Sequence, residues 1–198
     1  EMAETAARLA PESAEAQARV AELRMAQGDI KGAKEAAETA VRRDPGSARA
    51  LTVLGFIQLA EFHSAEALRT FENAVSADPG FPMARLGYGI ASIRRGEFGP
   101  GREQMQTAAS LDPGDSLIRS YLGKAYYEEK REIEASKEFE TAKSLDASDP
   151  TPHLYDAILK QTYNRPVEAL GSLQKSIELN DRRGVYRSRL LLDEDMAV

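Results

Sequence analysis

The chain has 198 residues, of which 42% are hydrophobic and 29% are charged, so it is long enough to bury a core without covalent cross-links. It has no cysteine, which excludes disulfide bonds, thiolate zinc sites and cysteine nucleophiles. Its 26 basic and 32 acidic side chains give a net charge of −6 and are spread along the chain, so we expect no nucleic-acid partner, and no apolar run is long enough for direct insertion into a membrane.

The predicted helices, taken in chain order, repeat with a fixed period. Prolines recur every 34 residues in the first part of the chain: Pro11, Pro45, Pro79 and Pro113. Small residues keep this spacing at three other phases, which begin at Ala6, Ala21 and Ala33. A small side chain at a fixed helical phase lets two helix axes approach closely. A fourth phase carries larger apolar residues, expected between one helix pair and the next: Ala37, Phe71, Met105, Phe139 and Leu173.

Each unit is predicted to be a helix, a short turn and a second helix. In residues 48–79 the apolar residues follow a helical period on both sides of the interruption FHS. The turn phase carries Gly28, Phe62, Gly96, Lys130 and Asn164. Glycine and asparagine suit the left-handed backbone that often ends a helix, whereas Phe62 and Lys130 suit it less well. In the recurring phrase DPG, we expect the aspartate to cap the following helix and the proline to lie in its first turn.

These residues and their spacing resemble tetratricopeptide repeats, and the resemblance covers residues 11–181. It implies an all-α fold, a right-handed α-solenoid of stacked antiparallel helix pairs. The five predicted units are residues 14–45, 48–79, 82–113, 116–147 and 150–181. Ala147 stands where the family usually has proline, so we expect an altered turn between the fourth and fifth units.

The two flanks differ from complete units. Residues 1–10 match only the second helix of a preceding repeat, which would make it a truncated repeat. Residues 182–198 are expected to form a capping helix, because Leu191 stands where the series has a small residue. The segment NDRRGVYRSRLLLDED resembles part of large exported bacterial tetratricopeptide proteins. The compartment stays open between cytoplasm and periplasm, with the periplasm favoured.

The resemblance implies that the first helices line a concave groove that binds an extended or helical segment of another protein. The groove phases carry Arg49, Thr52, Phe56, Leu59, Met83, Leu86, Ile90, Ile93, Arg94, Lys124, Tyr127, Leu154 and Ile158. The stretch from Phe56 to Ile93 is largely apolar at these phases, and we expect it to hold an apolar segment of a partner, whose polarity Arg94 and Lys124 would set. The alternative for each Leu or Ile is a place in the core.

No motif predicts catalysis, a metal site or a cofactor. His63 and His153 are 90 residues apart, whereas a metal site on one helix needs two ligands one turn apart. The pair Glu128 and Glu129 is typical of a solvated helix face. We therefore expect a protein-binding scaffold and not an enzyme. The alternative is a self-assembly module that forms homo-oligomers through uncovered terminal repeats, with Leu9 at one such edge.

Overall fold

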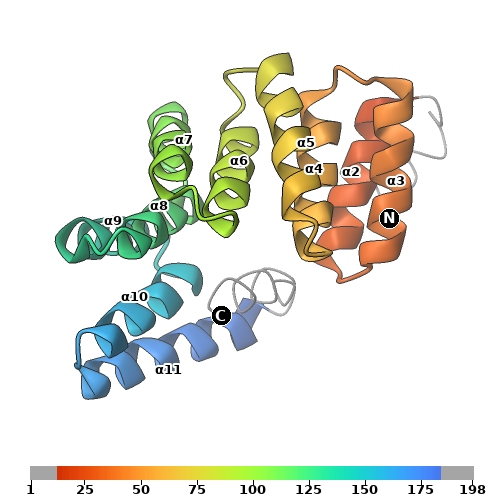
Figure 1. Cartoon of the computed structure of the whole chain (residues 1–198). Coiled ribbons are helices and arrows are strands. Elements are labelled where there is room, and N and C mark those ends of the chain that lie inside the picture. The colour runs from red at the N-terminus through yellow and green to blue at the C-terminus, as the bar shows by residue number, and fades with distance from the viewer. Residues whose placement is uncertain (1–12, 184–198) are drawn as a thin grey trace.

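The structure, a computed structural model, describes residues 13–183. Every regular element in this range is an α-helix, and the helices form successive pairs in a curved row (Figure 1). The pairs are α2 (Ala14–Ala26) with α3 (Ile30–Arg43), α4 (Ala48–Ala60) with α5 (Ser64–Ala77), α6 (Pro82–Arg94) with α7 (Phe98–Leu111), α8 (Ser116–Glu128) with α9 (Glu132–Leu145), and α10 (Thr151–Thr162) with α11 (Pro166–Arg183). The predicted all-α solenoid is confirmed. None of these described helices is both long and apolar enough to cross a membrane.

The hydrophobic core runs from one pair into the next. Each first helix after α2 contacts both helices of the pair before it, so no pair buries its apolar face alone. One buried cluster extends from Leu59 in α4 to Leu159 in α10. Within it, the ring of Phe139 stacks on Tyr155 of the following pair, with ring centroids 6.1 Å apart. The larger apolar phase therefore fills the space between pairs at Phe71 and Phe139, as predicted, whereas Leu173 at the same phase is exposed.

Small residues occupy the places where backbones come closest. A Cβ atom at Gly89 in α6 would lie 2.7 Å from the carbonyl oxygen of Gly101 in α7. A Cβ atom at Gly123 in α8 would lie 2.4 Å from Cε1 of Phe139 in α9. Real Cβ atoms do not approach neighbours this closely, so only glycine fits without a rearrangement. The predicted close approach of the paired helices is confirmed at these positions.

The turn inside every pair contains one residue with a left-handed backbone. The five residues are Gly28 (φ 81°), Phe62 (φ 62°), Gly96 (φ 83°), Lys130 (φ 61°) and Asn164 (φ 57°). The amide of the next residue then bonds to a carbonyl five residues back, as in His63 N to Gln58 O at 2.8 Å. This hydrogen bond satisfies an orphan carbonyl at the helix end. The shared turn thus imposes the conformation on Phe62 and Lys130 against their own preference.

The phrase DPG has a different role from the one predicted. Asp44 and Asp78 end the preceding helices, and each side chain accepts a hydrogen bond from the glycine amide two residues on. The next helix begins after the phrase, where the hydroxyl of Ser47 accepts from Ala50 N at 3.3 Å. The prediction that the aspartate caps the following helix was therefore wrong. The three residues form the turn between helices, so the cap falls on the residue after glycine.

The junction between the fourth and fifth pairs departs from the others. Asp149 is buried there, where it accepts a hydrogen bond of 2.6 Å from the hydroxyl of Ser116 and one of 3.0 Å from Thr151 N.

The second helix of the fifth pair is extended: α11 continues to Arg183, four residues past Leu179. Leu179 is at the phase of Leu145, where α9 ends, so α11 is longer than the other second helices of the described chain.

Candidate functional site

All the predicted groove residues lie on the first helices α4, α6, α8 and α10. Their accessibility divides them into two sets. The buried set is Thr52, Leu59, Leu86, Ile90, Ile93 and Lys124. The partly accessible set is Arg49, Phe56, Met83, Arg94, Tyr127, Leu154 and Ile158. Sequence phase alone did not separate these two sets.

The buried apolar members are part of the core. Leu59, Leu86 and Ile90 belong to the cluster that runs through the array, and Phe56 and Met83 pack against its edge. The Phe56 ring meets the Phe71 ring edge to face, with centroids 5.0 Å apart. An edge-to-face contact of this kind holds the side chain in one orientation. The partly accessible apolar side chains are thus supported from below by the core and keep one side available.

Two of the polar groove residues have intramolecular roles. The hydroxyl of Thr52 donates to the carbonyl oxygen of Ala48 at 2.7 Å. The guanidinium of Arg94 donates to the carbonyl oxygen of Leu59 at 2.7 Å and so ties α6 to the end of α4. The same carbonyl also accepts a hydrogen bond of 3.1 Å from Phe62 N, so Arg94 is an additional donor to it from across the repeat boundary.

Lys124 lies at the centre of a cluster with aromatic residues, which we call the Lys124 cluster: Lys124, Tyr127, Glu128 and Tyr155. The ammonium group of Lys124 pairs with the carboxylate of Glu128. It also lies 4.9 Å from the ring centroid of Tyr127 and 6.0 Å from that of Tyr155. Aromatic faces and a carboxylate together stabilise a buried cation. The Tyr127 hydroxyl is 3.0 Å from that of Thr162, so the cluster also joins α8 to α10.

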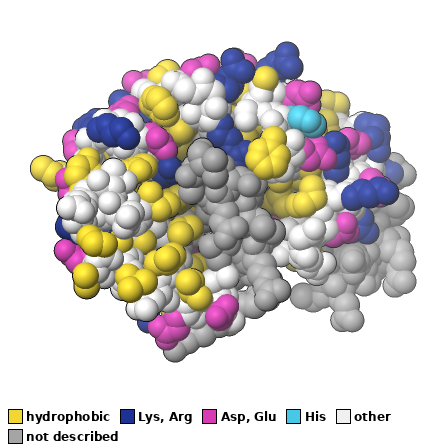
Figure 2. All heavy atoms as spheres, turned by 60° about the horizontal axis from the view of Figure 1, so that its bottom comes forward, with side chains coloured by type: hydrophobic (Ala, Val, Ile, Leu, Met, Phe, Trp, Pro, Cys, Tyr) yellow, Lys and Arg dark blue, Asp and Glu magenta, His cyan; other side chains and the backbone are white. Residues whose placement is uncertain are grey.

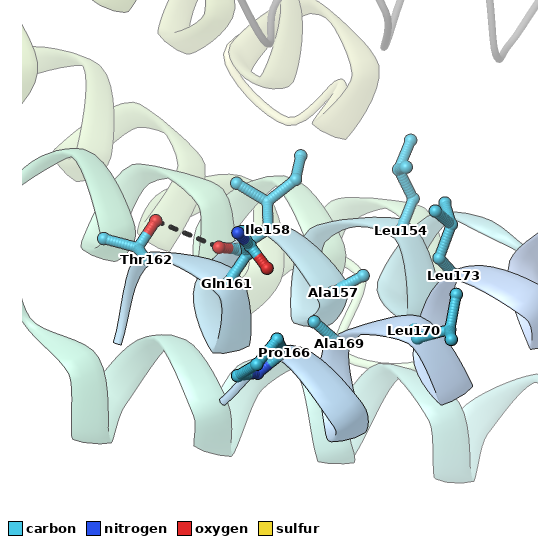
Figure 3. A pocket seen from close by; sticks show the side chains of 9 residues that line it. All are labelled: Leu154, Ala157, Ile158, Gln161, Thr162, Pro166, Ala169, Leu170 and Leu173. Carbon is cyan, nitrogen blue, oxygen red and sulfur yellow. Dashed lines mark hydrogen bonds between the residues drawn. The ribbon is translucent and has the colours of Figure 1, made fainter. Parts of the chain in front are cut away.

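A pocket of about 540 Å³ opens between α10 and α11 (Figure 3). Leu154, Ile158 and Gln161 enter it from α10, and Leu170 and Leu173 enter it from α11. Ala157 and Ala169 also line it, together with Thr162 and Pro166. None of these lining side chains is charged. In Figure 2, hydrophobic side chains gather on the part of the surface that α10 and α11 form.

The α11 side of this pocket was not among the predicted site residues. Leu170, Leu173 and Ile177 are exposed apolar residues spaced by three and four positions. In earlier units the phase of Leu173 is buried, so a leucine at this phase resembles an ordinary core position and its exposure could not be read from the sequence.

A buried acidic residue next to the pocket is neutralised by its neighbours. Asp156 Oδ2 accepts hydrogen bonds from Lys143 at 2.7 Å, Lys160 at 2.8 Å and Ser172 at 2.9 Å. Burial on its own would raise the pKa of Asp156, but the bonds from Lys143 and Lys160 outweigh it and lower the pKa below its ordinary value. Burial, helped by the charge of Lys143, also lowers the pKa of His153. This network joins α9, α10 and α11, and its role is to hold the three helices together.

Within residues 13–183, no three His, Cys, Asp or Glu side chains are grouped so that they could hold a metal ion. The two histidines lie apart: His63 is exposed at the start of α5, and His153 is partly buried in α10.

Comparison with known proteins relates the chain to one family. A family model described as tetratricopeptide repeat matches residues 21–61 and 63–116. No curated protein matches the chain significantly.

Several solved structures share the fold at low sequence identity. TTC0263, a thermophilic TPR protein of Thermus thermophilus, is 21% identical with a TM-score of 0.77, over 90% of this chain and 100% of that one. YrrB, described as a TPR protein with an unusual peptide-binding site, is 18% identical with a TM-score of 0.58, over 100% and 99%. A chain of the APC/C hetero-tetramer Cut9-Hcn1 gives a TM-score of 0.80 at 19% identity, with 90% of this chain but 34% of that one covered.

Proposed function

We propose that the chain is a scaffold for protein–protein interaction and that its inner surface binds an apolar peptide or helix of another protein. The tetratricopeptide repeat model that matches residues 21–61 and 63–116 supports the scaffold role. The observation that carries this proposal is the row of partly accessible apolar side chains on successive first helices. The row consists of Phe56, Met83, Tyr127, Leu154 and Ile158.

Core packing gives this row a fixed shape. Phe56, Met83, Tyr127 and Ile158 all pack against the buried cluster, so they lose little further side-chain freedom when a ligand binds. Leu154 and Ile158 at the end of the row also line the pocket between α10 and α11. The likeness to YrrB, a protein with a peptide-binding site, supports the same type of ligand.

The Lys124 cluster supplies a polar feature in the middle of the row. Glu128 is partly accessible, and its carboxylate is held in place by the buried ammonium group of Lys124. A donor on the partner, such as a backbone amide or a basic side chain, would find an oriented acceptor there. We propose that Lys124 acts through Glu128 and the two tyrosine rings, whereas Arg94 holds α4 and α6 in place.

The test is selection of binding peptides from a displayed library, followed by affinity measurement on variants. Phe56→Glu and Met83→Glu place charges on the apolar row, and we expect each to weaken the selected peptides by at least about tenfold. Ala65→Glu on the exposed start of α5 is the matched control and should bind normally. Peptides that bind all three variants equally, with helicity retained, would show that the row is not the site.

A second candidate function is self-assembly through a terminal repeat. The exposed apolar residues of α11 favour it, because a contiguous apolar surface on a folded protein usually meets a partner. Light scattering at increasing protein concentration tests it, and a constant monomer mass would argue against it. The proposed edge at Leu9 lies outside the described residues.

A further inference from the structure

The apolar face of α10 and α11 has the form of an interface, and we infer that it binds the same face of a second copy of this chain. The resulting homodimer would be symmetric, with the two α10–α11 pairs packed against each other. This inference rests on the second candidate function. The face shares Leu154 and Ile158 with one end of the proposed peptide-binding row, whereas Phe56 and Met83 do not line its pocket.

The face carries a continuous stripe of exposed apolar residues. The exposed fractions are 55% for Leu170, 39% for Leu173 and 54% for Ile177. Leu170, Leu173 and Ile177 are spaced by three and four residues, which is the spacing of the seam between two packed helices. The stripe borders the pocket, so an incoming helix would contact α10 and α11 together.

Equivalent positions in earlier repeats indicate what kind of structural element packs on this face. Leu173 is 34 residues after Phe139 and 102 after Phe71, and both rings are fully buried. Phe139 is covered by Tyr155 of the next helix, and Phe71 by the backbone of Gly87 in the next helix. The equivalent face of each earlier pair therefore holds a helix. Because α10 and α11 follow the same plan, their open face fits a helix as well.

The chain's own continuation fits this face poorly in the repeat register. A further helix at that spacing would place Arg189 and Asp193 at the phases of Tyr155 and Leu159, which are fully buried in α10. Two charged side chains would then enter a pocket lined by uncharged residues, which is unfavourable without partners. In addition, α11 continues to Arg183, whereas α9 ends at Leu145, the equivalent of Leu179.

A second copy fits the face chemically. An isologous contact would place Leu170 and Leu173 of one copy on apolar residues of the other, with no charged group in the pocket. Of the two polar side chains that line the pocket, Thr162 already donates to the carbonyl oxygen of Ile158 at 3.0 Å. Gln161 is exposed at the margin and keeps access to water. The contact would therefore bury apolar area without leaving a buried charge unpaired.

Sedimentation equilibrium of the full chain tests this inference directly. We expect a dimer, and we expect Leu173→Glu and Ile177→Glu each to raise its dissociation constant by at least about tenfold. Ile133→Glu is the control, because Ile133 is an apolar residue of α9 that is 82% exposed and does not line the pocket. The control should dimerise normally. A full chain that stays monomeric at all concentrations overturns the inference.

Cysteine cross-linking locates the contact, since the chain has no cysteine of its own. Leu173→Cys should form a disulfide-linked dimer on mild oxidation, whereas Ile133→Cys should not. If the full chain is a monomer and only a variant ending at Arg183 dimerises, then residues 184–198 cover the face and the inference is wrong.

The two proposals fail separately. Phe56→Glu should lose peptide binding and remain a dimer, whereas Ile177→Glu, at a residue that does not line the pocket, should become a monomer and retain peptide binding at the inner surface. Loss of both properties in the folded Ile177→Glu variant would contradict a dimer contact that is distinct from the peptide site.

Discussion

The ring of Phe71 in α5 lies directly against the backbone of Gly87 in the following helix, where a Cβ atom would be 2.0 Å from Cε1 of Phe71. Gly55 of the preceding helix is also close, since a Cβ atom there would be 2.7 Å from the same carbon. One aromatic ring thus occupies the space that two glycines leave, and it joins two helix pairs. This relationship depends on the absence of side chains as much as on the presence of the ring.

Gly87→Ala should therefore destabilise the protein, although alanine is the better helix former. We expect a loss of about 1 to 3 kcal/mol in the free energy of unfolding, because the ring is fully buried and cannot move aside freely. Gly171→Ala in α11 is the control, since a Cβ atom there would meet nothing within 4 Å. That change should stabilise by up to about 1 kcal/mol. Urea unfolding of both variants measures the difference, and equal stabilities would contradict the packing described.

Phe62 adopts a left-handed backbone that is costly for an aromatic residue. Phe62→Gly should raise the free energy of unfolding by about 1 kcal/mol, because glycine adopts this conformation without the Cβ clash and the Phe62 side chain is 66% exposed. The reverse change at the same turn phase, Gly96→Ala, should lower it. Thermal melts of the two variants should shift in opposite directions. A drop in stability for Phe62→Gly would mean that the ring makes a contact worth more than the strain.

Asp156→Asn should destabilise the fourth and fifth pairs together. The change leaves the ammonium groups of Lys143 and Lys160 without their shared carboxylate, and we expect a loss of about 3 kcal/mol. Asp181→Asn on the exposed side of α11 is the control and should be nearly neutral. Urea unfolding near neutral pH provides the measurement, and a loss of less than about 1 kcal/mol would show that the buried network contributes little.

The lowered pKa of Asp156 predicts how the stability of the protein changes in acid. The folded pKa of Asp156 is lowered, because the bonds from the two lysines outweigh the effect of burial. The group binds its proton more readily when unfolded, so its contribution is complete above the ordinary value of 3.8 and is lost as the pH falls through the lower folded value. Unfolding curves from pH 5 downwards should show this decline in the wild type. A decline of the same size in Asp156→Asn would assign it to other groups.

The lowered pKa of His153 predicts a second decline in the free energy of unfolding, at milder pH. Burial, with the nearby charge of Lys143, lowers its folded pKa below the ordinary value of 6.5. The unfolded chain therefore takes up the proton first, so the stabilising contribution is complete above pH 6.5 and is lost as the pH falls through the folded pKa. His153→Gln should remove the part of the slope that lies just below pH 6.5. An unchanged slope would show that His153 does not titrate in this range.

The sequence by itself determined the architecture of this protein. Residue size at a fixed helical phase decides which helices can approach closely. In every unit, the series that contains Gly89 has a small residue and the series that contains Phe139 has an apolar one. The turn phase was also readable, although Phe62 shows that a shared turn overrides the preference of one residue. These properties are local and repeated, so a period of 34 residues was sufficient to find them.

Only the tertiary structure decided which apolar side chains remain accessible. Leu86 and Met83 both carry a groove phase, yet the first is fully buried and the second is not. Phe139 and Leu173 share one phase, yet the first is covered by Tyr155 and the second is exposed. Exposure depends on what packs over a residue from another part of the chain, and that neighbour is not encoded at the residue's own position.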